Sequence, residues 1–186
     1  MSARRRMALF DFDGTLVDSD AALLAPYTAL GIEAQAVPPL GLPLSVACDQ
    51  AGVTVADYLE LYDASAAMPF PGIDHLIHRL PGWGLCSNKL RDSGERELAR
   101  LGWHPTVARF SDDFGGRPKA LDPVLLALEL APGDALFVGD TDHDRACAEL
   151  AGVDFALAGW NPRALQGARP GELVLDQPDD VLALLD

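Results

Sequence analysis

Two aspartates, Asp11 and Asp13, follow directly on a short apolar run in the segment MALFDFDGTLVDSD, which covers residues 7–20. Two like charges about 4 Å apart repel each other by roughly 4 kcal/mol at an intermediate effective dielectric. A nearby cation or a chemical role must therefore compensate for placing both carboxylates where a buried strand leaves the core. Carboxylates hold Mg²⁺ together with substrate oxygens, and one of them can be a nucleophile that forms an aspartyl phosphate. The second aspartate can then protonate a leaving oxygen and later activate water.

Further polar side chains come at the ends of three other apolar segments. They are Ser87, Asn88 and Lys89, then Arg117 and Lys119 in FGGRPKALDP, and then Asp140, Asp142, His143 and Asp144 in FVGDTDHD. Because ligands bind at the carboxyl ends of the strands in open α/β sheets, we expect these side chains to gather at one site. Clustered carboxylates with few imidazoles suit Mg²⁺. A lysine and a hydroxyl can hold the oxygens of a transferring phosphoryl group.

The elements that must position these side chains alternate along the chain. Six apolar segments are predicted to be strands, at residues 7–12, 83–87, 107–110, 135–139, 153–157 and 172–175. Helical patterns lie between most of them and after the last, at residues 73–80, from Ser93 to 101, from Asp122 with Pro123 at the first helical position, and at 142–150 and 178–185. Strands that alternate with helices predict an α/β fold, a doubly wound parallel sheet with helices on both faces.

The region from residue 18 to residue 68 departs from this alternation, because it contains no convincing strand. Helices are predicted at residues 20–30, 45–51 and 54–66, with a proline-rich loop, AVPPLGLPL, after the first of them. Thr54 and Asp57 have the spacing of a capping box. We therefore predict a core domain of residues 1–17 and 69–186, with a small all-helical cap of residues 18–68 inserted over the carboxyl edge of the sheet.

Composition limits the classes of partner. Hydrophobic residues make up 49% of the chain, which is enough for a packed core, and the formal net charge of −14 argues against nucleic-acid partners, whose binding depends on surplus Lys and Arg. No apolar run approaches the roughly 20 residues of a membrane helix, and the run after the basic start MSARRR is too short for a signal peptide. We expect a cytoplasmic protein without a membrane partner, whose arginines at 4–6 form a solvated tail. The three cysteines lack zinc-ligand spacing.

Four motifs in order now suggest a family. DFDGTLVDS, then Ser87-Asn88, then Lys119, then GDTDHD resembles the haloacid dehalogenase superfamily in motif order and strand context, over residues 7 to about 160. The insertion after the first motif resembles the helical cap of the first type in that superfamily. SNK at 87–89 and GRPK at 116–119 are most similar to the phosphoglycolate-phosphatase-like branch.

The resemblance implies a role for each motif residue. Asp11 would be the nucleophile and Asp13 the general acid and base, in Mg²⁺-dependent hydrolysis of small phosphomonoesters through an aspartyl phosphate. Mg²⁺ would bind the Asp11 carboxylate, the Asp13 backbone carbonyl and Asp140, with Asp144 either a direct ligand or a partner of one. The phosphate-binding residues would be Gly14, Thr15, Ser87, Asn88 and Lys119. The partner would be a small phosphorylated metabolite, and the protein a monomer or a homodimer.

Several alternatives stay open at this level. Arg117 competes with Lys119 for the lysine role, and Asp142 suits a solvated or capping position better than a ligand position. Within phosphoryl chemistry, a phosphomutase or a pyrophosphatase of the same superfamily is the alternative activity. A phospho-acceptor receiver domain also uses strand-end aspartates, a hydroxyl and a lysine, although receivers have no helical insertion after the first strand. A binding protein without catalytic activity is the remaining alternative.

The cap has an unusual charge composition. Between Arg6 and Arg79 the sequence contains no Lys or Arg. Phosphonatase-type chemistry needs a cap lysine for a Schiff base and is therefore disfavoured. A substrate with a second anionic group, such as phosphoglycolate, would have to find its cation at Lys89, Arg91 or another core residue, so the substrate itself stays undetermined by the sequence. The cap is also short for this branch.

Overall fold

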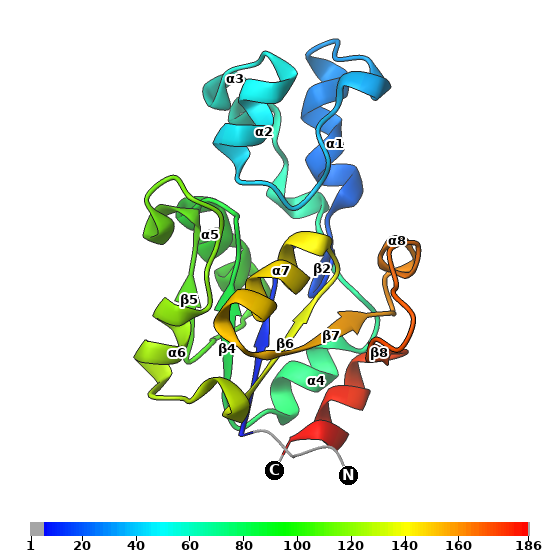
Figure 1. The fold of residues 1–186 in the computed structure, drawn as a ribbon. Coiled ribbons are helices and arrows are strands. Elements are labelled where there is room, and N and C mark those ends of the chain that lie inside the picture. The colour runs from blue at the N-terminus through cyan, green and yellow to red at the C-terminus, as the bar shows by residue number, and fades with distance from the viewer. Residues whose placement is uncertain (1–5, 186) are drawn as a thin grey trace.

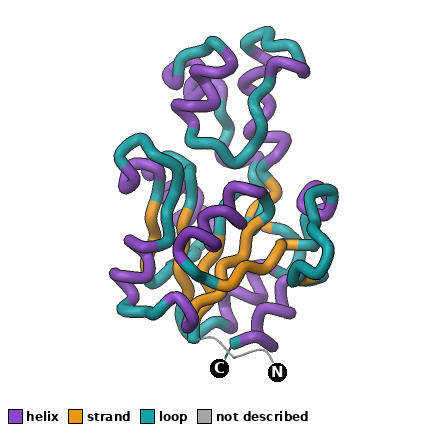
Figure 2. The backbone as a smooth tube through the Cα atoms, viewed as in Figure 1, coloured by secondary structure: helices purple, strands orange, loops and turns teal. Residues whose placement is uncertain are grey.

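The core of the protein is a six-stranded parallel sheet. The computed structural model describes residues 6–185, and within them the strand order is β5-β4-β1-β6-β7-β8. The strands are β1 (Met7–Phe10), β4 (Trp83–Cys86), β5 (Val107–Arg109), β6 (Ala135–Gly139), β7 (Asp154–Ala158) and β8 (Val174–Leu175). All six predicted strands are therefore present, each within two residues of its predicted start. β1 lies in the middle between β4 and β6, so their carboxyl ends meet at one place (Figures 1 and 2).

Helices cover both faces of this sheet, as predicted for a doubly wound fold. They are α4 (Ile73–Arg79), α5 (Arg91–Leu101), α6 (Asp122–Leu128), α7 (Asp142–Ala151) and α8 (Pro162–Leu165), followed by a 3₁₀ helix at Pro178–Leu184. The prediction was wrong in detail at the last segment, which is 3₁₀ rather than α-helical, and at α5, which begins two residues before Ser93. α8 was not predicted. Its N-cap is Asn161, whose side chain accepts a hydrogen bond from the Arg163 amide.

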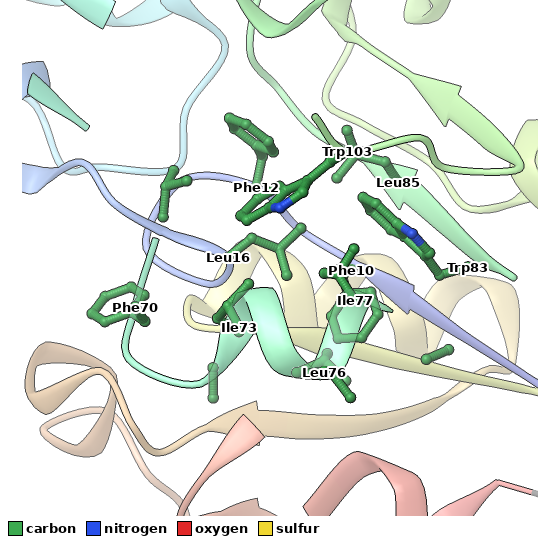
Figure 3. Packing of buried hydrophobic residues seen from close by; sticks show 14 of the residues in the cluster. Phe10, Phe12, Leu16, Phe70, Ile73, Leu76, Ile77, Trp83, Leu85 and Trp103 are labelled. Atoms are coloured by element: carbon green, nitrogen blue, oxygen red, sulfur yellow. The ribbon is translucent and has the colours of Figure 1, made fainter. Parts of the chain in front are cut away.

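Two apolar clusters, one on each face of the sheet, hold the layers together. The larger contains Phe10, Phe12, Leu16, Trp83 and Trp103 (Figure 3). Phe12 lies between the two motif aspartates in sequence, is fully buried, and packs edge-on against the Trp103 ring at a centroid distance of 6.4 Å. Burial of the side chain between them thus fixes the backbone that carries Asp11 and Asp13.

The helical region lies beyond the carboxyl ends of the core strands (Figure 1). Its helices are α1 (Asp20–Ala29), α2 (Leu44–Ala51) and α3 (Val55–Leu61), with short 3₁₀ turns at Ala34–Ala36 and Ala64–Ala66. Thr54 caps α3 as predicted, since its side chain accepts a hydrogen bond from the Asp57 amide at 3.0 Å. Tyr27, Cys48 and Tyr58 form a small core of their own between these helices.

The structure corrects two predictions about this region. β2 (Val17–Asp18) and β3 (Met68–Pro69) pair antiparallel, so Asp18 and Met68 are strand residues where no strand was predicted. The predicted helix 54–66 ends at Leu61, because the Asp63 side chain bonds the amide and hydroxyl of Ser65 and starts a separate 3₁₀ turn. The division at residues 18 and 68 into core and cap remains a proposal. Residues 4 and 5 of the predicted basic tail lie outside the described residues.

Candidate active site

The loop after β1 carries the first two candidate residues. Asp11 is 6% exposed, and its amide still pairs with the Val138 carbonyl of β6, so the nucleophile candidate is held by the sheet itself. Gly14 has a φ of +80°, and a Cβ there would lie 2.3 Å from Asp140 Oδ2. Only glycine fits at this position, because any side chain would collide with the carboxylate and strain the backbone.

Three buried carboxylates converge at the ends of β1 and β6. Each of Asp11, Asp140 and Asp144 offers an oxygen within 4.8 Å of the others. Asp144 belongs to a capping box at the start of α7, where one of its oxygens accepts hydrogen bonds from the Thr141 amide at 2.9 Å and hydroxyl at 2.5 Å. The start of α7 thus fixes the orientation of Asp144 toward the sheet.

Lys119 lies between two of these carboxylates. Its ammonium is 2.6 Å from Asp11 Oδ1 and 2.5 Å from Asp144 Oδ1, and its side chain is 4% exposed. The Lys119 amide donates to Asn88 Oδ1 at 2.8 Å, which ties the lysine to the end of β4. Arg117, the competing candidate, is exposed, and its Nε donates to the Phe114 carbonyl at 3.4 Å.

Burial perturbs the pKa values of the three carboxylates. Burial raises the pKa of Asp11 well above its usual range, although Lys119 acts against this, and burial together with the Asp144 charge raises the pKa of Asp140 to about 7. Burial would also raise the pKa of Asp144, but the Lys119 ammonium and the Thr141 hydrogen bonds outweigh it and hold that pKa below its usual value. Burial therefore costs the ionised forms of Asp11 and Asp140 more than their neighbouring cations return.

Arg163 is a contact that the sequence did not reveal. Its guanidinium donates to Asp140 Oδ2 at 2.6 Å and also binds Asp20, at the start of α1, at 2.6 and 3.1 Å. Arg163 therefore joins the carboxylate cluster to the helical region. Arg163 comes after the strand predicted at 153–157, but nothing in the sequence indicates that its side chain reaches Asp140.

The Asp13 side chain is not one of the three clustered carboxylates and pairs with a second lysine. Both of its oxygens accept from the Lys89 ammonium, at 2.9 and 3.1 Å, and the same ammonium lies 2.9 Å from Glu97 Oε1 and 2.9 Å from the Tyr62 hydroxyl. Glu97 has no exposed surface. Neither Glu97 nor Tyr62 was predicted as a site residue. For Glu97 the reason is that nothing in the sequence pattern of α5 distinguishes a buried glutamate from a solvated one.

The remaining candidates lie around the same edge. Ser87 is 2% exposed and accepts from the Lys89 amide, while the Asn88 amide group reaches the carbonyl of Gly41 in the helical region at 2.7 Å. The Thr15 hydroxyl donates to Asp140 Oδ1 at 3.1 Å. Asp142, by contrast, has a 73% exposed side chain that pairs with Arg145 and Arg169, as expected of a solvated residue.

Comparisons with known proteins agree with this geometry. The family model described as haloacid dehalogenase-like hydrolase matches residues 8–158. The chain belongs to this family. Its relatives include the phosphoglycolate phosphatases of Aquifex aeolicus, 30% identical over 97% of both chains, and of Xylella fastidiosa strain Temecula1, 30% identical over 86% of this chain and 82% of that one. A haloacid dehalogenase-like family hydrolase from Streptococcus pneumoniae has the same fold, with a TM-score of 0.77, 24% identity and coverage of 96% and 97%.

These similarities confirm the predicted haloacid dehalogenase family, its phosphoglycolate-phosphatase-like branch and a phosphatase as the type of enzyme. The donor set also suits the hard divalent cation expected for the family, because such cations bind oxygen ligands and three buried carboxylates converge here. Such an ion at Asp140 would share this carboxylate with Thr15 and Arg163, which bind its two oxygens. No described helix is long and apolar enough to cross a membrane.

Proposed function

We propose that this haloacid dehalogenase-family phosphatase hydrolyses small phosphomonoesters with Mg²⁺ as cofactor and Asp11 as nucleophile. The observation that carries the proposal is the position of the Asp11 carboxylate. It lines an open cleft on one side and lies beside Asp140, Asp144 and the Lys119 ammonium on the other. A carboxylate that is buried, balanced by a lysine and accessible to a ligand is suited to attack an electrophile rather than to stabilise the fold.

The reaction would proceed in two displacements at phosphorus. An Asp11 oxygen bonds to phosphorus while the ester P–O bond breaks, and Asp13 gives a proton to the departing alcohol oxygen. Asp13 then takes a proton from water, whose oxygen attacks the aspartyl phosphate and releases inorganic phosphate. Lys119, the Ser87 hydroxyl and backbone amides would hold the non-bridging oxygens during both steps, assisted by Gly14, Thr15 and Asn88 in shaping the loops.

Mg²⁺ would be held by the carboxylates of Asp11, Asp140 and Asp144 and by the Asp13 backbone carbonyl. When bound, the ion supplies positive charge that offsets the repulsion between a carboxylate nucleophile and a phosphate dianion. A fit of this kind is supported by the chemistry of the donor set, because the buried carboxylates of Asp11, Asp140 and Asp144 each offer an oxygen within 4.8 Å of the others.

The phosphoglycolate phosphatases among the relatives make small phosphorylated metabolites the first substrates to test. A pyrophosphatase or phosphomutase of the same family is the alternative, and a cytoplasmic location and a monomer or homodimer remain predictions. Release of phosphate from a sugar phosphate without isomer formation, and without comparable activity on pyrophosphate, would separate the phosphatase from both.

The test is the Asp11→Asn variant assayed for phosphate release from p-nitrophenyl phosphate with and without Mg²⁺. We expect activity in the wild type only with Mg²⁺ and its abolition in the variant. Asp92→Asn is the matched control, because the Asp92 side chain is 77% exposed on α5, and it should keep full activity. Undiminished turnover by Asp11→Asn would refute the nucleophile assignment. Stable phosphorylation of the chain without phosphate release would instead favour a phospho-acceptor.

A further inference from the structure

The cleft above Asp11 is lined differently by the core and by the helical region. The core contributes its polar and charged groups, among them Asp11, Asp13, Ser87, Asn88, Lys89 and Lys119. The helical region contributes only uncharged residues among those described, most of them leucines, prolines and tyrosines, including Tyr27, Tyr58, Leu59 and Tyr62. A bound phosphomonoester would place its phosphoryl group on the core side, so its alcohol group would face leucines, prolines and tyrosines.

Two tyrosines of this wall, Tyr58 and Tyr62, have no free hydroxyl. Tyr58 donates its hydroxyl to the Leu23 carbonyl and Tyr62 donates to Glu97, each at 2.9 Å. The ring of Tyr58 stacks on that of Tyr62 at a centroid distance of 6.1 Å and an interplanar angle of 17°, and it meets Tyr27 at 5.0 Å. An apolar or aromatic group beside the half-buried Tyr62 gains contact area without leaving the hydroxyl of Tyr58 or Tyr62 unpaired.

Both cations of the cleft are already neutralised. Lys119 is paired with two carboxylates, and the Lys89 ammonium uses its three N–H directions on Asp13, Glu97 and Tyr62. The Lys89 side chain is also only 5% exposed, so it cannot turn toward a ligand without breaking its ion pairs with Asp13 and Glu97. Arg91, the other core cation considered from the sequence, pairs with Glu95 and Asp113.

A carboxylate on the alcohol group of a substrate would therefore lack a partner. It would lie near Asp13 and beside apolar walls, where an unpaired charge loses its hydration without compensation. An uncharged group of the same size has no such penalty, and its apolar surface is removed from water. The relatives' phosphoglycolate, whose alcohol group carries a carboxylate, is the substrate that this arrangement disfavours.

We propose that the cleft selects phosphate esters of uncharged, largely apolar or aromatic alcohols and discriminates against esters whose alcohol carries an anion. This inference rests on the proposed function, since it concerns the leaving group of the same reaction. For such a substrate the P–O ester bond breaks as the Asp11 oxygen bonds to phosphorus, and the proton from Asp13 makes the departing oxygen a neutral alcohol. The alcohol product is therefore uncharged when it dissociates from the apolar side of the cleft.

Three esters of primary alcohols test the inference by their kcat/KM for phosphate release with Mg²⁺. They are benzyl phosphate, 2-phosphoglycolate, and the amide of phosphoglycolate, which matches it in size but lacks the second charge. We expect the amide to exceed phosphoglycolate by at least about tenfold, and benzyl phosphate to be the best of the three. A kcat/KM for phosphoglycolate that equals or exceeds that of its amide would overturn the inference.

A lysine introduced on the apolar side of the cleft provides a second test. Leu59 lines the cleft on α3 and is 37% exposed, so Leu59→Lys can place an ammonium at its mouth without burying it. Leu61→Lys is the matched control, because Leu61 is 44% exposed on the same helix and does not line the cleft. We expect the ratio of phosphoglycolate to amide kcat/KM to rise severalfold in Leu59→Lys only, and an equal change in both variants would contradict the inference.

The two levels of proposal fail in distinguishable ways. If none of the three esters releases phosphate with Mg²⁺, or if Asp11→Asn retains turnover, the proposed phosphatase mechanism itself is wrong. If all three release phosphate through Asp11 but phosphoglycolate is preferred, only the selectivity inference is wrong.

Discussion

Replacement of Lys119 by methionine is expected to destabilise the protein strongly in the absence of Mg²⁺. The variant removes the ammonium that lies 2.6 Å from Asp11 and 2.5 Å from Asp144 while keeping an unbranched side chain of similar length. Loss of one partner from a buried ion pair costs about 3–5 kcal/mol, because the remaining charge stays buried without compensation. Two carboxylate oxygens no more than 4.8 Å apart also repel each other by about 3.5 kcal/mol or more at an effective dielectric of 20.

Proton uptake limits this cost. Because burial raises the pKa of Asp140 to about 7, the cluster can bind a proton near neutral pH instead of bearing the full repulsion. We therefore expect a loss near the lower end of the range, about 3 kcal/mol in the free energy of unfolding. The loss should shrink when Mg²⁺ is added, since the ion restores positive charge among the same carboxylates.

Urea denaturation followed by circular dichroism, with and without Mg²⁺, measures this loss. The double variant Lys119→Met/Asp144→Asn removes one of the uncompensated charges and should be more stable than Lys119→Met alone. Arg96→Met is the control, because Arg96 is 76% exposed and its surface pair with Asp92 is worth at most about 0.5 kcal/mol. The reasoning is refuted if Lys119→Met unfolds at the wild-type urea concentration, or if the double variant is less stable than the single one.

Three further predictions concern the core and the metal site. Gly94→Ala should lower the free energy of unfolding in urea by about 1–3 kcal/mol, because the added Cβ would lie 2.2 Å from the Phe110 ring, whereas Gly133→Ala, with nothing within 4 Å, should cost nothing; equal effects would contradict the packing. Mg²⁺ at ten times its dissociation constant should stabilise the wild type by about 1.4 kcal/mol, measured by thermal denaturation, and absence of any shift would argue against a metal site. Arg163→Gln should enlarge the thermal shift produced by Mg²⁺, because the guanidinium that binds Asp140 at 2.6 Å no longer competes with the ion, and a smaller shift would contradict this competition.

Those features that depend on strand order could be predicted from the sequence. Asp11, Lys119, Asp140 and Asp144 follow buried segments, and the parallel sheet brings the ends of these segments to one edge. The position of Asp144 over the sheet follows from the capping box that the sequence TDHD makes at the start of α7. Local chemistry and topology agree here, so the geometry of the carboxylate cluster could be anticipated.

Features that depend on docking of the helical region could not be predicted. The Lys89 network requires Tyr62 to reach Glu97 across the two parts of the fold, and nothing in the local pattern encodes that distance. The same holds for Arg163, whose long side chain spans from Asp140 to Asp20. β2 and β3 were missed for a related reason, since strands of two residues carry no alternating pattern and exist only through their pairing.

Reductive trapping of the reaction intermediate tests the central claim most directly. The wild type is mixed with benzyl phosphate and Mg²⁺, quenched in acid during turnover and treated with borohydride, which converts an aspartyl phosphate into homoserine. Peptide mass spectrometry should then find homoserine at position 11 only when both substrate and Mg²⁺ are present. Homoserine at another aspartate, or none at position 11 despite phosphate release, would contradict the assignment of Asp11 as the nucleophile.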